Sequence, residues 1–406
     1  MLSPSHSPDR APPSPAESLA ASLERELDVL QRAGLRRTLT CVQQRRGVAA
    51  VVEGQAVVDF SSNDYLGLAS DPRLARAAEH FLEHEAFGAG AAHSIAGHHP
   101  VHETLERQIA LLKHSEAALL FSSGFAANVG AITALVGRED IVYSDSLNHA
   151  SIIDACRLCR GTTARFAHGD LDALERQLGA TAGKYRRRII VVEGVYSMDG
   201  DLCPLNELVE LAGRFDAWVY LDDAHGTGVL GAHGGGAAEL WGVEDKVAIT
   251  VATLGKAFGA AGGAVAGPAV LRDFLLNRAR SFIFTTASPP VLAAAALEGI
   301  WLAQQEPWRR QRLLLNAQHL RDSLGSIDIS PPPPGPGHIT PVIIGDAERT
   351  LRIARRLRAS GFLVGAIRPP SVPLGTARLR ITVSASHTTR EIDDLLVALT
   401  DALRLE

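Results

Sequence analysis

The chain has 406 residues, 46% of them hydrophobic and 21% charged, which is typical of a globular protein with a large core and excludes a disordered or collagen-like chain. Its formal net charge of −5 gives no sign of a basic surface for nucleic acid, so we expect no nucleic-acid partner. The apolar runs are too short for a membrane span, and the four cysteines are too scattered for a disulfide framework. We therefore expect no membrane partner and a cytoplasmic location.

The N-terminal part divides into a tail and a structured segment. Residues 1–16 are rich in Pro and Ser, which predicts a disordered N-terminal tail. Leu19, Leu23, Leu27 and Leu30 follow at helical spacing, so an amphipathic helix is expected over residues 17–37. A β-rich piece over residues 48–60 completes a predicted N-terminal helix and β segment, residues 17–60.

Short apolar runs then alternate with helical patterns. The runs cover residues 117–121, 140–145, 187–195, 217–223 and 247–253, and residues 262–267 follow closely enough to add one more strand. This alternation is typical of βαβ units, so we predict an α/β domain over residues 61–288 with a mostly parallel central sheet and helices on both faces.

The texture changes after this region. A long helical segment, the loop SPPPPGPGH, the strands ITPVIIG and RLRITVSASH with a helix between them, and a final amphipathic helix follow in turn. We predict a smaller C-terminal α+β domain over residues 289–406.

Three elements point to one chemistry. Lys256 is one of only four lysines and follows an apolar strand among small residues, where an amine can lose its proton and form a Schiff base with an aldehyde. The strand of residues 217–223 ends in Asp222 and Asp223, with His225 just beyond, and an aspartate at that edge can pair with a protonated pyridine nitrogen. The segment FSSGFAANVG combines a strand, a small-residue turn and a helix start, which suits a phosphate. Together these elements predict a site for pyridoxal 5′-phosphate (PLP).

Other motifs are weaker. GTGVLG is separated from its strand, so we disfavour a dinucleotide site. The H-x-x-E-H match of residues 80–84 is interpreted as a solvated helix face, and the His98, His99 and His102 group lacks converging carboxylates or cysteines. The C-x-x-C of residues 156–159 has no second pair to complete a zinc site. We expect no metal ion.

Seven ordered motifs resemble those of the α-oxoamine synthases. They are NDYLG, SSGFAAN, NHAS, VYSMDGDLCPL, DDAHGTG, TLGKAFG and IRPPSVPLGTARLRIT, and they extend from residue 63 to residue 382. The resemblance implies the type I aminotransferase fold, PLP as cofactor, and an acyltransferase that condenses an amino acid with an acyl thioester and releases CO2.

The resemblance also implies catalytic residues, namely Lys256, His149, Asp222 and His225. Lys256 would form the Schiff base and remove the α-proton of the amino acid. Asp222 would pair with the pyridine nitrogen, His225 would hydrogen-bond the ring hydroxyl oxygen, and His149 would stack on the ring face.

The remaining cofactor contacts are implied in the same way. Gly124 and Phe125 match backbone contacts to the cofactor phosphate, and Thr253 matches a hydroxyl near it. Ser197 would lie against the cofactor. Thr286 matches a phosphate contact offered by a neighbouring subunit, which implies a homodimer with shared active sites.

Substrate contacts complete the set. Arg380 resembles the arginine that binds the amino-acid carboxylate, a role that suits a bidentate guanidinium. Arg36 and Ser371 align with acyl-substrate positions, and Asn63 is expected near the same site. The tract AIRPPSVPLGTARLRIT is most similar to the biotin-pathway members, which use L-alanine and a pimeloyl thioester.

Two positions depart from the family pattern and leave the acyl chain open. His93 stands where an arginine is common, and Ser371 replaces a usual threonine. Glycine-using members, such as a glycine C-acetyltransferase or a 5-aminolevulinate synthase, remain as alternatives, with an aminotransferase behind them. Whether the acyl group arrives on coenzyme A (CoA) or on an acyl carrier protein is also open.

Overall fold

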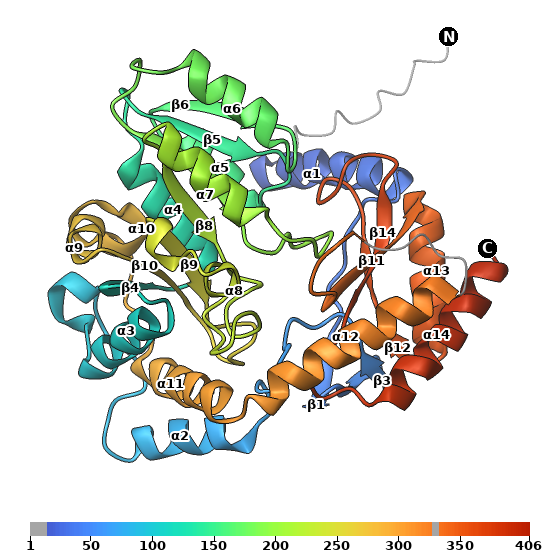
Figure 1. Cartoon of the computed structure of the whole chain (residues 1–406). Coiled ribbons are helices and arrows are strands. Elements are labelled where there is room, and N and C mark those ends of the chain that lie inside the picture. Colours follow the sequence, from blue (N-terminus) through green and yellow to red (C-terminus); the bar gives the residue numbers. More distant parts are fainter. Residues whose placement is uncertain (1–13, 327–332) are drawn as a thin grey trace, which may run out of the picture.

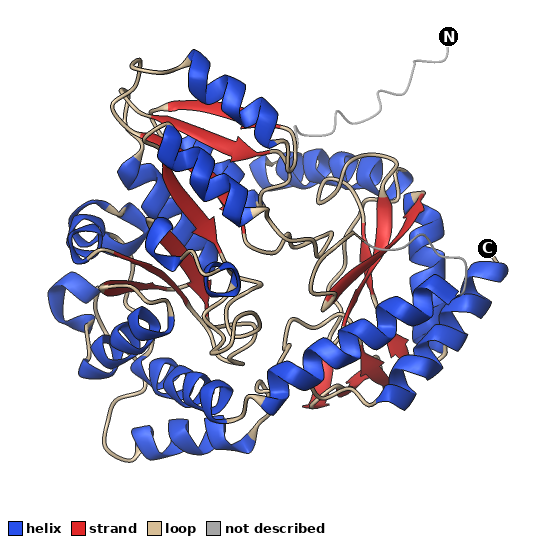
Figure 2. Ribbon diagram, in the orientation of Figure 1, coloured by secondary structure: helices blue, strands red, loops and turns tan. Residues whose placement is uncertain are grey.

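The computed structural model describes residues 14–326 and 333–406, which fold around three β-sheets (Figures 1 and 2). The largest sheet has seven strands in the order β4-β10-β9-β8-β7-β5-β6. Its strands are β4 (Ala117–Phe121), β5 (Ile141–Asp145), β6 (Thr162–Phe166), β7 (Arg188–Glu193), β8 (Trp218–Asp222), β9 (Ile249–Thr253) and β10 (Gly263–Gly267). Only β10 runs antiparallel to its neighbours, so the predicted mostly parallel sheet is confirmed.

One strand of this sheet was missing from the prediction. The edge strand β6 has the sequence TTARF, and most of its side chains are exposed. An edge strand needs few apolar residues because only part of it meets the core, so it leaves a weak signal in the sequence.

Helices cover both faces of the large sheet. Along β7, Ile189 and Val191 belong to one hydrophobic core, while Ile190 and Val192 belong to the other. Successive strand residues point to opposite faces, so a continuous apolar run fills both cores. The helices are α3 (Pro100–Leu112), α4 (Gly124–Leu135), α5 (Ala150–Leu158), α6 (Leu171–Ala180), α7 (Leu205–Arg214), α8 (Ala237–Trp241), α9 (Ala269–Arg278) and α10 (Arg280–Ile283), with short η1 (His93–Gly97) and η2 (Glu244–Lys246) segments.

Two smaller sheets lie on the other side of the molecule (Figure 1). One has the order β1-β2-β3-β12, from β1 (Val42–Arg46), β2 (Ala49–Val52), β3 (Gln55–Asp59) and β12 (Phe362–Leu363). The other has the order β11-β14-β13, from β11 (Ile339–Gly345), β13 (Gly365–Ile367) and β14 (Ala377–Thr382). The remaining helices are α2 (Pro72–Leu82), α11 (Pro290–Gln305), α12 (Trp308–Ser326), α13 (Ala347–Ala359) and α14 (Thr389–Arg404).

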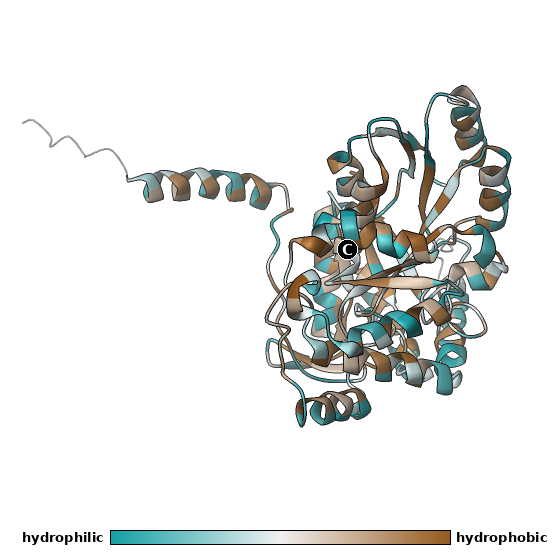
Figure 3. Ribbon diagram, turned by 90° about the vertical axis from the view of Figure 1, so that its left-hand side faces the viewer, coloured by the Kyte–Doolittle hydropathy of each residue, from teal (hydrophilic) through white to brown (hydrophobic). Residues whose placement is uncertain are grey.

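The N-terminal helix differs from its predicted bounds. Helix α1 spans Pro15–Arg32, because the Ser14 side chain and Glu17 form a capping box and Pro15 occupies the first turn. The predicted disordered tail is therefore wrong for residues 15 and 16, and residues 1–13 lie outside the described part. Figure 3 shows α1 projecting from the body of the chain, and none of its residues is buried.

Among the described residues, no helix is long and apolar enough to cross a membrane. The predicted domain boundaries at residues 61 and 289 remain predictions.

Candidate active site

The candidate site is built on the carboxyl ends of neighbouring strands. Strands β9, β8, β7 and β5 end at Thr253, Asp222, Glu193 and Asp145, and the segments that follow them carry Lys256, His225, Ser197 and His149. Parallel strands bring their carboxyl ends to one edge of a sheet, which gathers side chains that lie more than a hundred residues apart in sequence.

Lys256 lies at the centre of this edge. Its Nζ is 2.9 Å from Nε2 of His225. Burial lowers the pKa of Lys256 to about 8, against the opposing effect of the nearby carboxylates Asp222 and Glu193, and the positive charge of Arg380 adds to the lowering. A substantial fraction of this amine is therefore neutral, and nucleophilic, near neutral pH.

A hydrogen-bonded chain runs from Lys256 to Arg380. Nδ1 of His225 is 2.6 Å from the Tyr65 hydroxyl, which donates to Asn63 Oδ1 at 3.1 Å. Both terminal nitrogens of Arg380 donate to that same Asn63 oxygen at 3.2 Å. If the Tyr65 proton is used toward Asn63, His225 must donate through Nδ1 and accept through Nε2 from Lys256.

The surroundings keep this chain in that protonation state. Burial and the nearby positive charge of Lys256 hold the pKa of His225 well below its usual value, so its imidazole is neutral. Burial raises the pKa of Tyr65 to about 12, so its hydroxyl retains the proton. His338 supports the arrangement, with Nε2 lying 3.1 Å from the His225 carbonyl oxygen and its ring edge-on to Tyr65.

The two adjacent aspartates have different surroundings. Asp222 accepts hydrogen bonds from the Asn128 amide at 2.6 Å and from the backbone N–H of Ala224 at 3.1 Å. Asp223 instead forms a buried ion pair with Lys113 at 2.7 Å, beneath the site. Among the described residues no cation pairs with Asp222, so this buried carboxylate is available to a cationic group of a bound molecule.

The predicted phosphate turn lies beside the end of β9. Helix α4 begins at Gly124, and the Ser123 hydroxyl caps it by accepting from the backbone N–H of Ala126. A Cβ atom built on Gly124 would be 3.8 Å from Cβ of Thr253, which brings two predicted phosphate contacts together. Phe125 is half exposed at the helix start. The first backbone N–H groups of the helix are thus available to an anion.

Other predicted residues surround this centre. His149 is exposed at the start of α5, where Nδ1 lies 2.8 Å from the Ser151 hydroxyl. Ser197 is buried, and its carbonyl oxygen accepts from Nε of Arg380 at 2.7 Å. Thr286 is exposed and pairs through its backbone with Ala92.

Arg36 and Ser371 lie on a separate groove rather than in the hydrogen-bonded chain. Arg36 lines the groove directly, and Arg37 donates to the Ser371 hydroxyl at 3.1 Å. The structure thus brings Lys256, His225, Asn63 and Arg380 together and leaves these two at the periphery.

Sequence reasoning gave no role to several residues of the site. Tyr65, Asn128 and His338 complete its hydrogen bonds, and Glu193 ends β7 in full burial. Burial and the negative charge of Asp222 raise the pKa of Glu193 well above its usual value. The one available signal for Glu193 was its position at the end of an apolar run, where a carboxylate is unusual.

The disfavoured motifs lie elsewhere. His80, Glu83 and His84 are exposed at the end of α2. The rings of His93, His98 and His102 gather with centroids 5.0 to 5.5 Å apart, and their nitrogens are engaged in hydrogen bonds, including one of 2.9 Å between His93 and His98. Cys156 is buried, and its pKa is raised by burial to about 12.

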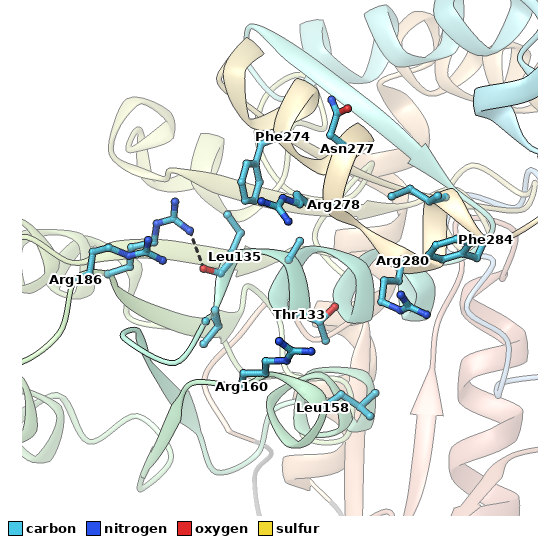
Figure 4. A pocket seen from close by; sticks show the side chains of 15 residues that line it. Thr133, Leu135, Leu158, Arg160, Arg186, Phe274, Asn277, Arg278, Arg280 and Phe284 are labelled. Carbon is cyan, nitrogen blue, oxygen red and sulfur yellow. Dashed lines mark hydrogen bonds between the residues drawn. The ribbon is translucent and has the colours of Figure 1, made fainter.

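The described part of the chain has a second arginine-rich groove, of about 670 Å³ (Figure 4). Its walls include the end of α4 at Leu135 together with Arg186 and Arg187, which precede β7. Arg187 donates to the Leu135 carbonyl at 2.9 Å. The amino end of β7 lies at the sheet edge opposite Lys256, so this groove is separate from the candidate active site.

Comparisons with known proteins agree with the geometry. Residues 55–399 match the family described as aminotransferase class I and II. An 8-amino-7-oxononanoate synthase of Alkalilimnicola ehrlichii is 45% identical over 390 residues, which is 96% of this chain and 99% of the relative. A serine palmitoyltransferase of S. paucimobilis with bound PLP superposes with a TM-score of 0.90 at 29% identity, covering 96% of this chain and 98% of that one. An 8-amino-7-oxononanoate synthase of Francisella tularensis gives a TM-score of 0.75 at 26% identity, covering 86% and 98%.

Proposed function

The chain belongs to the aminotransferase class I and II family as an α-oxoamine synthase, and we propose that it condenses L-alanine with a pimeloyl thioester. The products are 8-amino-7-oxononanoate, CO2 and the free thiol, which places the reaction in biotin biosynthesis. The 45% identity to a relative of that name over nearly the whole chain carries the proposal.

PLP is the cofactor, and the residues present fit it. The buried Asp222 carboxylate has room for a cation, the start of α4 offers N–H groups to a phosphate, and Lys256 offers an amine to an aldehyde. Bound PLP supplies an electron-withdrawing ring that stabilises negative charge at the α-carbon of the amino acid. Asp222 would hold the pyridine nitrogen in its protonated form, and Gly124, Phe125 and Thr253 would hold the phosphate.

The chain's own groups then position alanine and move its α-proton. Arg380 binds the alanine carboxylate, and its orientation is fixed by Ser197 and Asn63. Lys256 is the base that takes the α-proton onto Nζ, because its lowered pKa leaves a neutral amine to receive it. His225 accepts a hydrogen bond from that amine, and His149 covers the exposed side of the site.

The assembly we propose is a homodimer. Leu19, Leu23 and Leu27 form an apolar stripe on α1 that is exposed in the single chain, and a second copy would cover it. In such a dimer Thr286 would reach the neighbouring phosphate site.

Steady-state kinetics test the function. We expect the holoenzyme to have a higher kcat/KM with L-alanine and pimeloyl-CoA than with glycine and either acetyl-CoA or succinyl-CoA. A clear preference for glycine with acetyl-CoA would contradict the proposal and indicate a glycine C-acetyltransferase.

A further inference from the structure

The groove that Arg36 lines has a volume of about 840 Å³ and is rich in arginine. It lies between the residues after α1, the helix α13 and the strand β13. We call it the arginine groove and define it by four residues: Arg36, Arg37, Arg355 and Arg368.

The charges of these four arginines are not compensated. Other arginines of this region have carboxylate partners, since Arg352 pairs with Glu406 at 2.6 Å and Arg358 with Glu53 at 3.2 Å. Among the described residues, none of the four defining arginines lies within 4 Å of a carboxylate oxygen, and the exposed Glu348 on the groove wall pairs with none of them.

The defining arginines also act on one another. Burial and the positive charges of Arg37 and Arg355 lower the pKa of Arg368. Like charges held together without a counter-ion cost free energy, and a bound anion relieves that cost. Polar contacts fix the guanidinium groups in place, because Arg37 donates to the Ser371 hydroxyl and Arg368 donates to the Gly34 carbonyl.

The groove is continuous with the amino-acid site. Gly365 and Ala366 line it, and they pair across the sheet with Arg380 and Leu379 of β14. On the other wall, Ser61 precedes Asn63 by two residues, and Asn63 accepts from Arg380. A molecule that extends outward from Arg380 would therefore reach the arginines.

We propose that the arginine groove binds the phosphate groups at the carrier end of the acyl thioester. The inference rests on the proposed function, which requires a thioester carbonyl near Lys256 while the carrier stays outside. Guanidinium groups bind phosphate through charge-assisted, often bidentate hydrogen bonds. CoA and the phosphopantetheine arm of a carrier protein share this chemistry, since both carry a phosphate ester beyond the pantetheine chain.

The test uses one acyl group on three carriers. Pimeloyl-CoA carries the full set of phosphates, pimeloyl-phosphopantetheine carries one, and pimeloyl-N-acetylcysteamine carries none. In the holoenzyme we expect Arg355→Gln to raise the KM for pimeloyl-CoA about tenfold, one lost charge-assisted contact, with kcat unchanged. The KM for the N-acetylcysteamine thioester should not change.

The matched control is Arg356→Gln. Arg356 is the next residue on α13, pairs with Glu406 at 2.9 Å and does not line the groove, so this variant should leave every KM unchanged. Arg37→Gln is a second variant of the groove and should behave as Arg355→Gln does.

The outcomes separate the two phosphate sources. An Arg355 effect shared by pimeloyl-phosphopantetheine supports a site for the phosphate common to both carriers, and an effect confined to pimeloyl-CoA supports a site for the nucleotide phosphates. Equal KM changes for the phosphate-free thioester would overturn the inference, because the groove would then contact the acyl chain. Unchanged KM values in both groove variants would also overturn it.

Failure of the proposed function is distinguishable by a binding arm. Free CoA should bind the wild-type holoenzyme more tightly than the Arg355→Gln variant by calorimetry, whichever amino acid is the substrate. If no pimeloyl thioester turns over and CoA still shows this difference, the proposed function is wrong and the groove assignment stands. Equal CoA affinities would refute the groove assignment.

Discussion

Two neighbouring carboxylates at the end of β8 show how burial assigns different tasks to identical side chains. Asp222 ends the strand and faces the Asn128 amide, whereas Asp223 faces Lys113. The backbone alternation that sends successive side chains to opposite sides accounts for this divergence. Because only Asp223 has a charged partner within the chain, the two residues predict different defects when they or their partners are replaced.

Asp222→Asn should weaken cofactor binding and activity. The variant keeps the shape of the side chain and can still accept from Asn128, but it removes the charge that would pair with a pyridinium. We expect a loss of about 2–5 kcal/mol, as for one partner of a buried charged pair. PLP titration and kcat/KM measure the loss. A thermal unfolding midpoint equal to that of the wild-type apo-protein would show that the defect is local, and wild-type PLP affinity would contradict the assignment.

Lys113→Met should instead destabilise the fold. It leaves the fully buried Asp223 without its cation, which typically costs about 3–5 kcal/mol. The free energy of unfolding in urea measures the effect, with the exposed Lys184→Met as the control. Equal stability of the two variants would argue that Asp223 is not charged in the folded protein.

The lowered pKa of Lys256 predicts a pH dependence. As the pH rises through about 8, the folded amine loses its proton and becomes nucleophilic, whereas an ordinary lysine does so near 10.5. The rate at which apo-protein takes up PLP should therefore rise with pH and reach half its maximum near pH 8. Stopped-flow absorbance measures this rate, and a midpoint near the ordinary lysine value would disprove the lowered pKa.

At the scale of the elements, the site depends on how closely β10 approaches the start of α4. A Cβ atom at Gly263 would lie 2.5 Å from the backbone nitrogen of Gly124, nearer than any real contact allows. Glycine is therefore required at this strand position, and it lets the helix start lie against the end of β9. The position of the phosphate turn is thus set by a residue on another strand.

Gly263→Ala tests this dependence. The added methyl group must push α4 away, which should cost about 1–3 kcal/mol of stability and weaken PLP binding. Gly213→Ala on α7 is the matched control, because a Cβ there meets no atom within 4 Å. Unfolding curves and PLP titrations of both variants provide the comparison. If the Gly263 variant binds PLP as the wild type does, the close approach is not needed for the phosphate turn.

At the scale of the whole molecule, α1 is the element that a single chain leaves uncovered. It projects from the body in Figure 3, and none of its residues is buried. An isolated helix of 18 residues gains little stability from its own hydrogen bonds, so its apolar stripe is expected to pack against another surface. A second copy of the chain would provide that surface.

Replacing Leu23 and Leu27 by glutamate should weaken the dimer. Two leucines that lose their burial account for about 3 kcal/mol or more, which raises the dimer dissociation constant by about a hundredfold. Sedimentation velocity over a dilution series measures it, with Arg25→Gln on the same helix as the control. An unchanged dissociation constant would show that α1 takes no part in the interface.

The sequence by itself determined the alternation of strands and helices, since continuous apolar runs such as residues 188–193 require two covered faces. It also singled out Lys256, because lysines are rare here and strand ends meet at one edge. Only the tertiary structure decided which aspartate faces the site, that Tyr65 and Asn63 connect Lys256 to Arg380, and that Glu193 is buried beside them. These contacts join residues up to 317 positions apart, and local sequence patterns carry no information about such distances.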